Sequence, residues 1–199
     1  MPLSSNYRID RSKYLVKDEF HKLLESAKKN DRDYLLFAVC GNLGLRVGEL
    51  VSIKVSDIDF EHSVIGIRTL KQKKEKGVID EMLLPEGINT LISDYIKKYK
   101  LKQEDWLFKS DKGVLSKRGC QWIFDKYATK CGLKIKGKDN KKGRGIHCLR
   151  HFQGIILSEA TNNPTKVAKL LRHRNLDTSL AYAHILDEKE IRKKIGTIL

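Results

Sequence analysis

The apolar positions of the chain predict a mainly helical fold. In residues 16–29 apolar side chains recur every three to four positions, which is the repeat of an amphipathic helix. Residues 34–40 form a continuous apolar stretch that predicts a buried helix, and we expect Gly41 and Gly44 to break or bend it before Arg46. Residues 47–53 then predict one or two further helical turns.

Residues 57–84 have a different pattern. Apolar and polar residues mix at strand-like spacing around residues 58–67, the basic stretch KQKKEKG follows, and VIDEMLL comes after it. This order predicts two strands joined by a lysine-rich turn. We expect this hairpin to belong to a small antiparallel three-stranded sheet.

The remainder of the chain returns to helical spacing. Pro85 and Glu86 are typical of a helix start, and Ser116 can cap another helix. Residues 147–160 predict one helix, and Asn163 with Pro164 predicts the start of the next, through residue 171. We expect Asp177 to cap a helix that carries residue 182, and residues 188–199 to form a last short helix. The fold class is therefore α+β, mainly helical with the small sheet.

Charge narrows the class of partner. The 199 residues carry 40 Lys and Arg against 25 Asp and Glu, a formal net charge of +15, which favours a polyanion. A ribosomal or membrane-surface protein would share this balance, so charge alone names no function. No apolar run reaches membrane-spanning length and no secretory signal precedes residue 16, so we expect a cytoplasmic protein without a membrane partner.

The four cysteines lack paired CxxC spacing, so we expect reduced thiols that pack in the interior. They are Cys40, Cys120, Cys131 and Cys148. A zinc site from Cys148, His147 and His151 is conceivable, but no second cluster matches it, so we expect no metal.

Four short segments carry candidate chemistry. They are GLRVGEL around Arg46, the turn around Lys71, HCLRH at residues 147–151, and LLRHRNLDTSLAYAH at residues 170–184. Arg46 and Arg150 offer two planar guanidinium forks, which can hold the non-bridging oxygens of a phosphodiester and stay charged at every physiological pH. His147, three residues before Arg150, can donate to the same phosphate or move a proton near neutral pH.

In this order the segments resemble the catalytic domain of the tyrosine recombinases, also called the phage integrase family. The family pattern is an Arg in G-L-R-x-x-E, a hairpin Lys, an H-x-x-R pair, a His or Trp in L-G-H, and a Tyr nine residues later. The chain has Gly44-Leu45-Arg46 with Glu49, then Lys71, then His147 and Arg150, then His173 and, nine residues on, Tyr182. One motif would be weak evidence, but the whole set occurs in order.

The resemblance implies roles for these residues. Tyr182 would be the nucleophile, and the surrounding cations would favour its phenolate, since an ordinary tyrosine pKa is about 10. Lys71 would protonate the leaving 5′-oxygen, although Lys73 or Lys74 could take that role. His173 would donate to the phosphoryl oxygens, and Glu49, one turn after Arg46, would orient that arginine. Neither a metal, a cofactor nor ATP is expected, because arginines stabilise the charge and the phosphotyrosine keeps the bond energy.

The implied partner is double-stranded DNA, with no small-molecule substrate. Basic residues outside the catalytic set are candidates for DNA contacts: Lys73, Lys74, Lys76, Lys136, Lys138, Lys141, Lys142, Arg144, Arg172 and Arg174. The run at 132–145 is either a DNA-backbone contact or a disordered loop. Family members work as assemblies, commonly tetramers on two DNA sites, and the tail at 187–199 could dock on a neighbouring copy through Ile191, Ile195 and Leu199.

Two departures from the family pattern stand out. Arg172 occupies the position where L-G-H usually has Gly, which would tilt His173 or add a phosphate contact. Typical members also carry a separate N-terminal core-binding domain that clamps DNA. Because the first catalytic-type helix begins near Val16, we expect residues 1–199 to be a single catalytic domain without it.

The predicted activity is site-specific DNA recombination through a 3′-phosphotyrosyl intermediate. One alternative is a catalytically weak DNA-binding regulator or excision accessory, which predicts the loss of a site residue, and none is lost. A second is a type IB topoisomerase, but that class usually carries Lys at the position of His147. A basic RNA-binding protein is a third, and no stacking-aromatic motif supports it.

Overall fold

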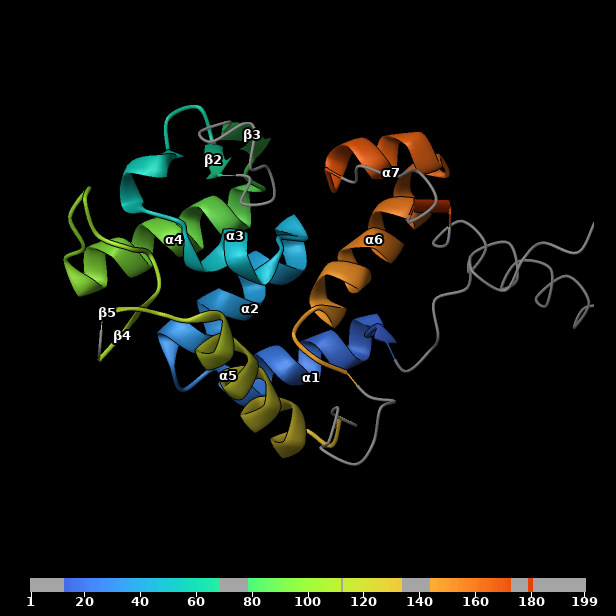
Figure 1. Cartoon of the computed structure of the whole chain (residues 1–199), viewed down its shortest axis with the longest axis horizontal. Helices are drawn as coiled ribbons and strands as arrows, with labels where there is room; N and C mark the ends of the chain where they lie inside the picture. Colours follow the sequence, from blue (N-terminus) through green and yellow to red (C-terminus); the bar gives the residue numbers. More distant parts are fainter. Residues whose placement is uncertain (1–12, 69–78, 112, 134–143, 173–178, 181–199) are drawn as a thin grey trace, which may run out of the picture.

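The computed structural model describes residues 13–68, 79–111, 113–133, 144–172 and 179–180 (Figure 1). The helices in this part of the chain are α1 (Lys17–Ala27), α2 (Asp31–Leu43), α3 (Val47–Val51), the 3-10 helix η3 (Val55–Asp57), α4 (Glu86–Tyr99), α5 (Lys117–Lys130), α6 (Cys148–Thr161) and α7 (Pro164–Leu170). The strands are β1 (Ile58–Asp59), β2 (Val64–Arg68), β3 (Ile79–Leu83), β4 (Lys109–Ser110) and β5 (Gly113–Val114).

The helix ends follow local side-chain chemistry. Ser116 accepts a hydrogen bond from the backbone N–H of Gly119 and caps α5, as its position predicts. Asn163 accepts from the N–H groups of Thr165 and Lys166, and Pro164 fills the first position of α7. These expected helix starts are confirmed.

Strands β1, β2 and β3 form the expected three-stranded antiparallel sheet, in that order. In the β2–β3 pair Ile65 lies opposite Met82, and Ile67 lies opposite Asp80. Ile65 and Ile67 are buried on the core face, as the alternation of the sequence predicts. The second sheet, β4–β5, was not expected from the sequence, because strands of two residues give no periodic pattern.

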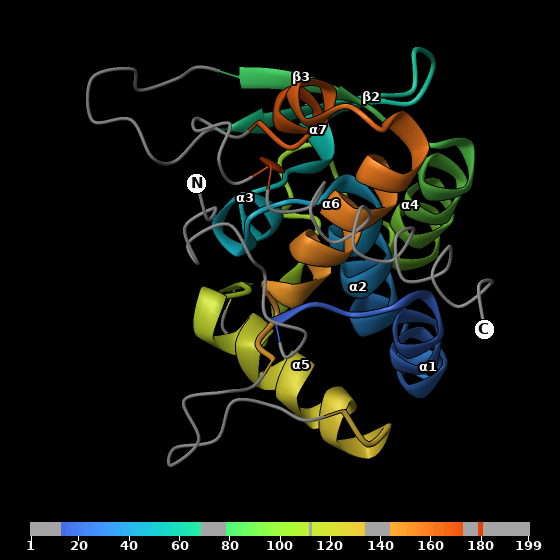
Figure 2. The same ribbon diagram turned by 90° about the vertical axis from the view of Figure 1, so that its right-hand side faces the viewer.

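Helix α2 is the centre of the domain and packs against α1, α3, α4 and α6. Its residues 35–41 are all buried, in agreement with the apolar stretch at 34–40. In both views the three-stranded sheet and α7 lie at one end of the molecule, whereas α1 and α5 lie at the other (Figures 1 and 2). No described helix is long and apolar enough to cross a membrane.

The two glycines of α2 behave differently from one another. Gly41 lies inside the helix and does not break it, so the expectation of a break at this glycine was wrong. A Cβ at Gly41 would lie 2.5 Å from the ring of Phe20, which shows that the small residue is needed for close packing against α1. Gly44 does end the helix, in the left-handed conformation with φ +61°.

A small apolar cluster attaches α7 to α6. Its buried members are Tyr14, Ile155, Val167 and Leu171. Leu171 is fully buried and directly precedes Arg172, so this packing fixes the backbone at the end of α7. The turn at residues 171–172 therefore has a defined position relative to α6 and α2.

Candidate active site

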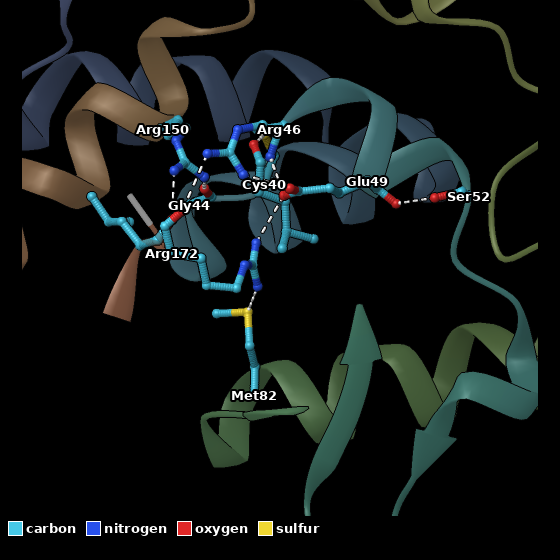
Figure 3. Close-up of polar contacts among 10 residues, drawn as sticks. Cys40, Gly44, Arg46, Glu49, Ser52, Met82, Arg150 and Arg172 are labelled. Atoms are coloured by element: carbon cyan, nitrogen blue, oxygen red, sulfur yellow. Dashed lines mark hydrogen bonds and ion pairs between the residues drawn. The ribbon is translucent and has the colours of Figure 1, made fainter. Parts of the chain in front are cut away.

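The site lies where the end of α2, the start of α3, the start of α6 and the turn after α7 meet (Figure 3). Of the expected catalytic residues, the structure describes Arg46, His147 and Arg150, together with Glu49. The other three, Lys71, His173 and Tyr182, lie outside the described residues. The part of the site that can be built from contacts is therefore its arginine cluster.

Arg46 is positioned by the sharp end of α2. The left-handed Gly44 turns the chain, and Arg46 then takes an extended conformation as the N-cap of α3. Its backbone N–H donates to Glu49 Oε2 at 2.9 Å, and its Nη1 donates to Glu49 Oε1 at 2.7 Å. Glu49 thus holds both the backbone and the side chain of Arg46, and its role in orienting that arginine stays a prediction.

Arg150 is the most enclosed of the site's arginines that the structure describes, with a relative exposure of 2%. Its Nη1 donates to the carbonyl oxygen of Gly44 at 2.6 Å, and its Nη2 donates to that of Leu171 at 2.5 Å. Backbone carbonyls satisfy donors without cancelling the positive charge, so Arg150 keeps its full charge in a region of low dielectric.

Arg46 and Arg150 converge on the same turn. Arg46 Nη2 donates to the carbonyl oxygen of Arg172 at 3.2 Å, one residue after the carbonyl that Arg150 holds. Figure 3 shows both guanidinium groups next to this turn, although they come from α3 and α6. Two like charges held at neighbouring carbonyls repel one another, and an anion bound between them would offset that repulsion.

His147 lies at the start of α6, in the N-cap position, and is exposed, whereas Arg150 one turn later is buried. The ring of His147 packs edge-to-face on that of His151, with centroids 4.8 Å apart. His147 is therefore accessible from solvent at the start of α6.

Arg172 was expected to tilt His173 or to contact phosphate. His173 lies outside the described residues, and the Arg172 side chain itself contacts Glu49 and Met82. Its backbone is left-handed, with φ +53°, which explains why glycine suits this position in the family. Its Nη2 donates to Glu49 Oε2 at 2.8 Å, and the guanidinium also contacts Met82 of β3. Sequence reasoning missed this second arginine on Glu49, because only the fold brings residues 49 and 172 together.

Glu49 is 2% exposed and lies between Arg46 and Arg172. Burial alone would raise the pKa of this carboxyl, but the Arg172 charge and the hydrogen bonds from Arg46 outweigh it and hold the pKa below its usual value. Glu49 is therefore ionised at neutral pH. For Arg172, burial lowers the pKa, and the Glu49 charge opposes that effect.

The basic residues expected to bind DNA divide into two groups. Eight of them lie outside the described residues: Lys73, Lys74, Lys76, Lys136, Lys138, Lys141, Lys142 and Arg174. Arg144 is described and is buried, with Nε donating to the Tyr14 carbonyl at 3.0 Å and Nη2 donating to Glu19 Oε1 at 3.0 Å. Unlike Arg150, which is held by uncharged carbonyls, Arg144 is paired with the carboxylate of Glu19, so we remove Arg144 from the candidate DNA contacts.

The cysteines match their expected packing role. All four are free thiols; Cys40, Cys120 and Cys148 are buried, and Cys131 is partly so. Burial raises the pKa of Cys40, beside the arginine cluster, to about 12, so this thiol is no competing nucleophile at neutral pH. Within the described residues no group of three or more His, Cys, Asp or Glu side chains could hold a metal ion.

Comparison with solved structures identifies the fold. The chain superposes on a crystal structure of XerA recombinase with a TM-score of 0.73 at 24% identity, covering 93% of this chain and 65% of that one. It superposes equally, at 0.73 and 22% identity, on XerH site-specific recombinase in a post-cleavage complex with a palindromic difH substrate, covering 94% and 53%. The fold is that of a tyrosine recombinase catalytic domain.

The sequence comparisons define the family. The Phage integrase family profile matches residues 13–189, and the chain belongs to this family. It is 33% identical over 177 residues to a tyrosine recombinase of Pseudothermotoga lettingae, covering 89% of this chain and 58% of that protein. It is 32% identical over 181 residues to the tyrosine recombinase XerA of Thermococcus onnurineus, covering 88% and 59%. The chain therefore spans somewhat over half the length of these relatives.

Proposed function

We propose that this chain cleaves and rejoins DNA through a covalent bond between Tyr182 and a 3′-phosphate, as a site-specific recombinase. The observation that carries the proposal is the convergence of Arg46 and Arg150 on the turn at residues 171–172. This turn leads directly to His173 and, nine residues further, to Tyr182. The turn that Arg46 and Arg150 hold therefore lies just before the segment that carries the proposed nucleophile.

In the proposed reaction the scissile phosphate binds against Arg46 and Arg150, whose charges stabilise the extra negative charge of the pentacovalent transition state. His147 and His173 add donors to its oxygens. The Tyr182 hydroxyl passes its proton to His147 or to solvent, and its oxygen attacks phosphorus. The bond to the 5′-oxygen breaks, and Lys71 gives that oxygen a proton. Rejoining is the reverse, with the 5′-hydroxyl attacking the phosphotyrosine, and it needs neither ATP nor a metal.

The proposed partners follow from the same reaction. XerH is seen bound to a DNA substrate and lambda integrase as a dimer on DNA, which supports DNA binding and self-association for this chain. We propose a tetramer on two DNA sites, with residues 187–199 docking on a neighbouring copy. The basic residues that lie outside the described parts of the chain are the proposed contacts to the DNA backbone.

The experiment is covalent capture on a duplex pool whose target sequence need not be known. Each duplex has a randomised central segment with a nick, so that the short strand released by cleavage diffuses away and the adduct accumulates. The chain is incubated with the pool in chelator, and adducts are isolated under denaturing conditions and sequenced. We expect adducts on 3′-phosphates that are absent with Tyr182→Phe. Adducts that persist in Tyr182→Phe, or none with the wild type, would contradict the proposal.

A second step separates recombination from relaxation alone. Two labelled duplexes of a captured sequence are mixed with the chain, and strand exchange between them is measured beside relaxation of a supercoiled plasmid carrying one copy. Exchange between duplexes supports a recombinase. Relaxation without exchange would favour a topoisomerase.

A further inference from the structure

The segment that leads into α6 is held from two sides. On one side the buried Arg144 is bound to Glu19 of α1. On the other side Gln121 of α5 accepts a hydrogen bond from the backbone N–H of Ile146, with Oε1 at 3.2 Å. His147 comes directly after Ile146, so both contacts act on the residues just before a proposed site histidine.

The Gln121 amide has one favoured orientation. Its Nε2 donates to Asp125 Oδ1 at 2.7 Å, one helical turn further along α5. An ionised carboxylate accepts hydrogen bonds and never donates, so it selects the NH₂ end of the amide and leaves Oε1 facing Ile146. Gly145 allows this close approach, because an added Cβ there would lie 3.0 Å from Gln121 Oε1. Asp125 thus orients Gln121, and Gln121 holds Ile146.

Ile146 transmits this contact to the first turn of α6. Because Ile146 is buried, its N–H needs an acceptor within the protein, and Gln121 is the one that the described residues supply. The carbonyl of Ile146 accepts in turn from the N–H of Leu149 at 3.1 Å. The backbone before His147 is therefore joined to the helical turn that carries it, and a shift at Ile146 would move His147.

This link does not extend to Arg150. The guanidinium of Arg150 is held by the carbonyls of Gly44 and Leu171, which lie at the ends of α2 and α7. Loss of the Gln121 contact should therefore displace the histidine at the start of α6 much more than the arginine one turn later.

We propose that Gln121 is a positioning residue for His147: by holding the backbone N–H of Ile146, it sets where the His147 ring lies relative to the scissile phosphate. The proposal rests on the proposed function, since it assumes that a phosphodiester binds beside His147. Asp125 acts through Gln121, by orienting its amide.

The test uses the full chain and a duplex recovered from the pool. Gln121→Leu removes the acceptor for Ile146 and keeps a side chain of similar volume. The double variant Gln121→Glu/Asp125→Asn, the exchanged pair, keeps both hydrogen bonds, because its carboxylate can accept from Ile146 and from the amide at position 125. Gln121→Leu is also combined with His147→Ala. The single-turnover rate of adduct formation at saturating protein, the DNA affinity and the thermal unfolding midpoint are measured for each.

We expect Gln121→Leu to slow adduct formation by about 10- to 100-fold with unchanged DNA affinity, as when a group at the reacting phosphate is misplaced. The exchanged pair should restore the rate to within about threefold of the wild type, since it keeps the contact to Ile146. In the His147→Ala background, Gln121→Leu should change the rate by no more than about twofold, because the side chain that it positions is gone. A merely structural role would slow both backgrounds by the same factor.

Three results would overturn the proposal. They are a wild-type rate in Gln121→Leu, an exchanged pair as slow as Gln121→Leu, and a rate loss beyond about twofold when Gln121→Leu is added to His147→Ala. Weaker DNA binding by Gln121→Leu would also overturn it, since Gln121 would then act on binding and not on the position of His147.

The position of His147 can also be followed without DNA cleavage. The ring resonances of His147 in nuclear magnetic resonance spectra are assigned by their loss in His147→Ala. They should shift in Gln121→Leu and return in the exchanged pair. If the wild type forms no adduct, the proposed function fails, but these resonances still test the positioning role, and unchanged resonances in Gln121→Leu would refute it.

Discussion

The guanidinium of Arg150 donates to the carbonyl oxygen of Gly44 at 2.6 Å, across 106 positions of sequence. A second bond, to the carbonyl of Leu171, ties the same side chain to the end of α7. Arg150 is therefore both a cation of the candidate site and a structural link between α2, α6 and the turn at residues 171–172. The two roles can be separated by comparing it with Arg46.

Replacing Arg150 by alanine should reduce both stability and cleavage. The substitution removes the Arg150 donor from two buried carbonyl groups, and we expect the free energy of unfolding to fall by about 2–4 kcal/mol. Urea unfolding followed by circular dichroism measures this loss. Arg46→Ala is the matched control. The Arg46 side chain is 24% exposed, so its removal should lower the free energy of unfolding less than Arg150→Ala does, while reducing adduct formation by a similar factor. Equal stability losses would show that Arg150 has no special linking role.

The sequence predicted the elements well where the pattern is long. The amphipathic helix at 16–29 and the β2–β3 hairpin depend on periodicities that extend over many residues, and the buried helix around 34–40 depends on a long continuous apolar stretch. Gly41 shows the limit, because a glycine inside a helix and a glycine that ends one look alike in sequence. Only the packing of Phe20 against it distinguishes them.

The site was predictable as a set of residues but not as a set of contacts. The Glu49–Arg46 bond follows from a spacing of three residues, which a helix N-terminus brings together. The Glu49–Arg172 pair and the buried position of Arg144 depend on tertiary packing between distant segments. A basic residue in a lysine-rich segment gives no local signal that its guanidinium is directed inward.

Gly44→Ala should destabilise the chain and slow cleavage. The backbone there has φ +61°, and an added Cβ would lie 2.5 Å from Leu171 Cδ2. The strained backbone and the close contact with Leu171 together should lower the free energy of unfolding by about 1–3 kcal/mol, which urea unfolding measures. The turn that positions Arg46 would shift with it.

Gly87→Ala is the matched control for that substitution. Gly87 lies in α4, and its added Cβ would meet nothing within 4 Å. We expect a gain of about 0.5–1 kcal/mol from the better helix propensity of alanine. A loss at Gly87 similar to that at Gly44 would mean that the close contact with Leu171 does not limit residue 44.

The free energy of unfolding at acid pH should depend on Glu49. Its pKa is below the usual value in the folded chain, so the folded state gains stability from this carboxylate above the unfolded pKa of about 4.3, and the gain disappears as the pH falls through the folded pKa. We expect the stability difference between wild type and Glu49→Gln to be largest near pH 7 and to shrink below about pH 4. Urea unfolding of both proteins from pH 3 to 7 measures it. A difference that grows toward low pH would contradict the lowered pKa.

Arg144 and Lys138 should differ in their effect on DNA binding. Arg144 is buried and bound to Glu19 and the Tyr14 carbonyl, so Arg144→Gln should destabilise the fold by about 1–3 kcal/mol and leave the salt dependence of DNA affinity unchanged. Lys138 is a proposed contact to the DNA backbone, so its substitution should change the salt dependence of DNA affinity and leave the stability of the fold unchanged. If it neutralises one phosphate, Lys138→Gln reduces the slope of log affinity against log salt by about 0.9 without loss of stability. Fluorescence anisotropy with a labelled duplex at 50–300 mM salt measures both slopes, and a reduced slope for Arg144→Gln would return that residue to the set of DNA contacts.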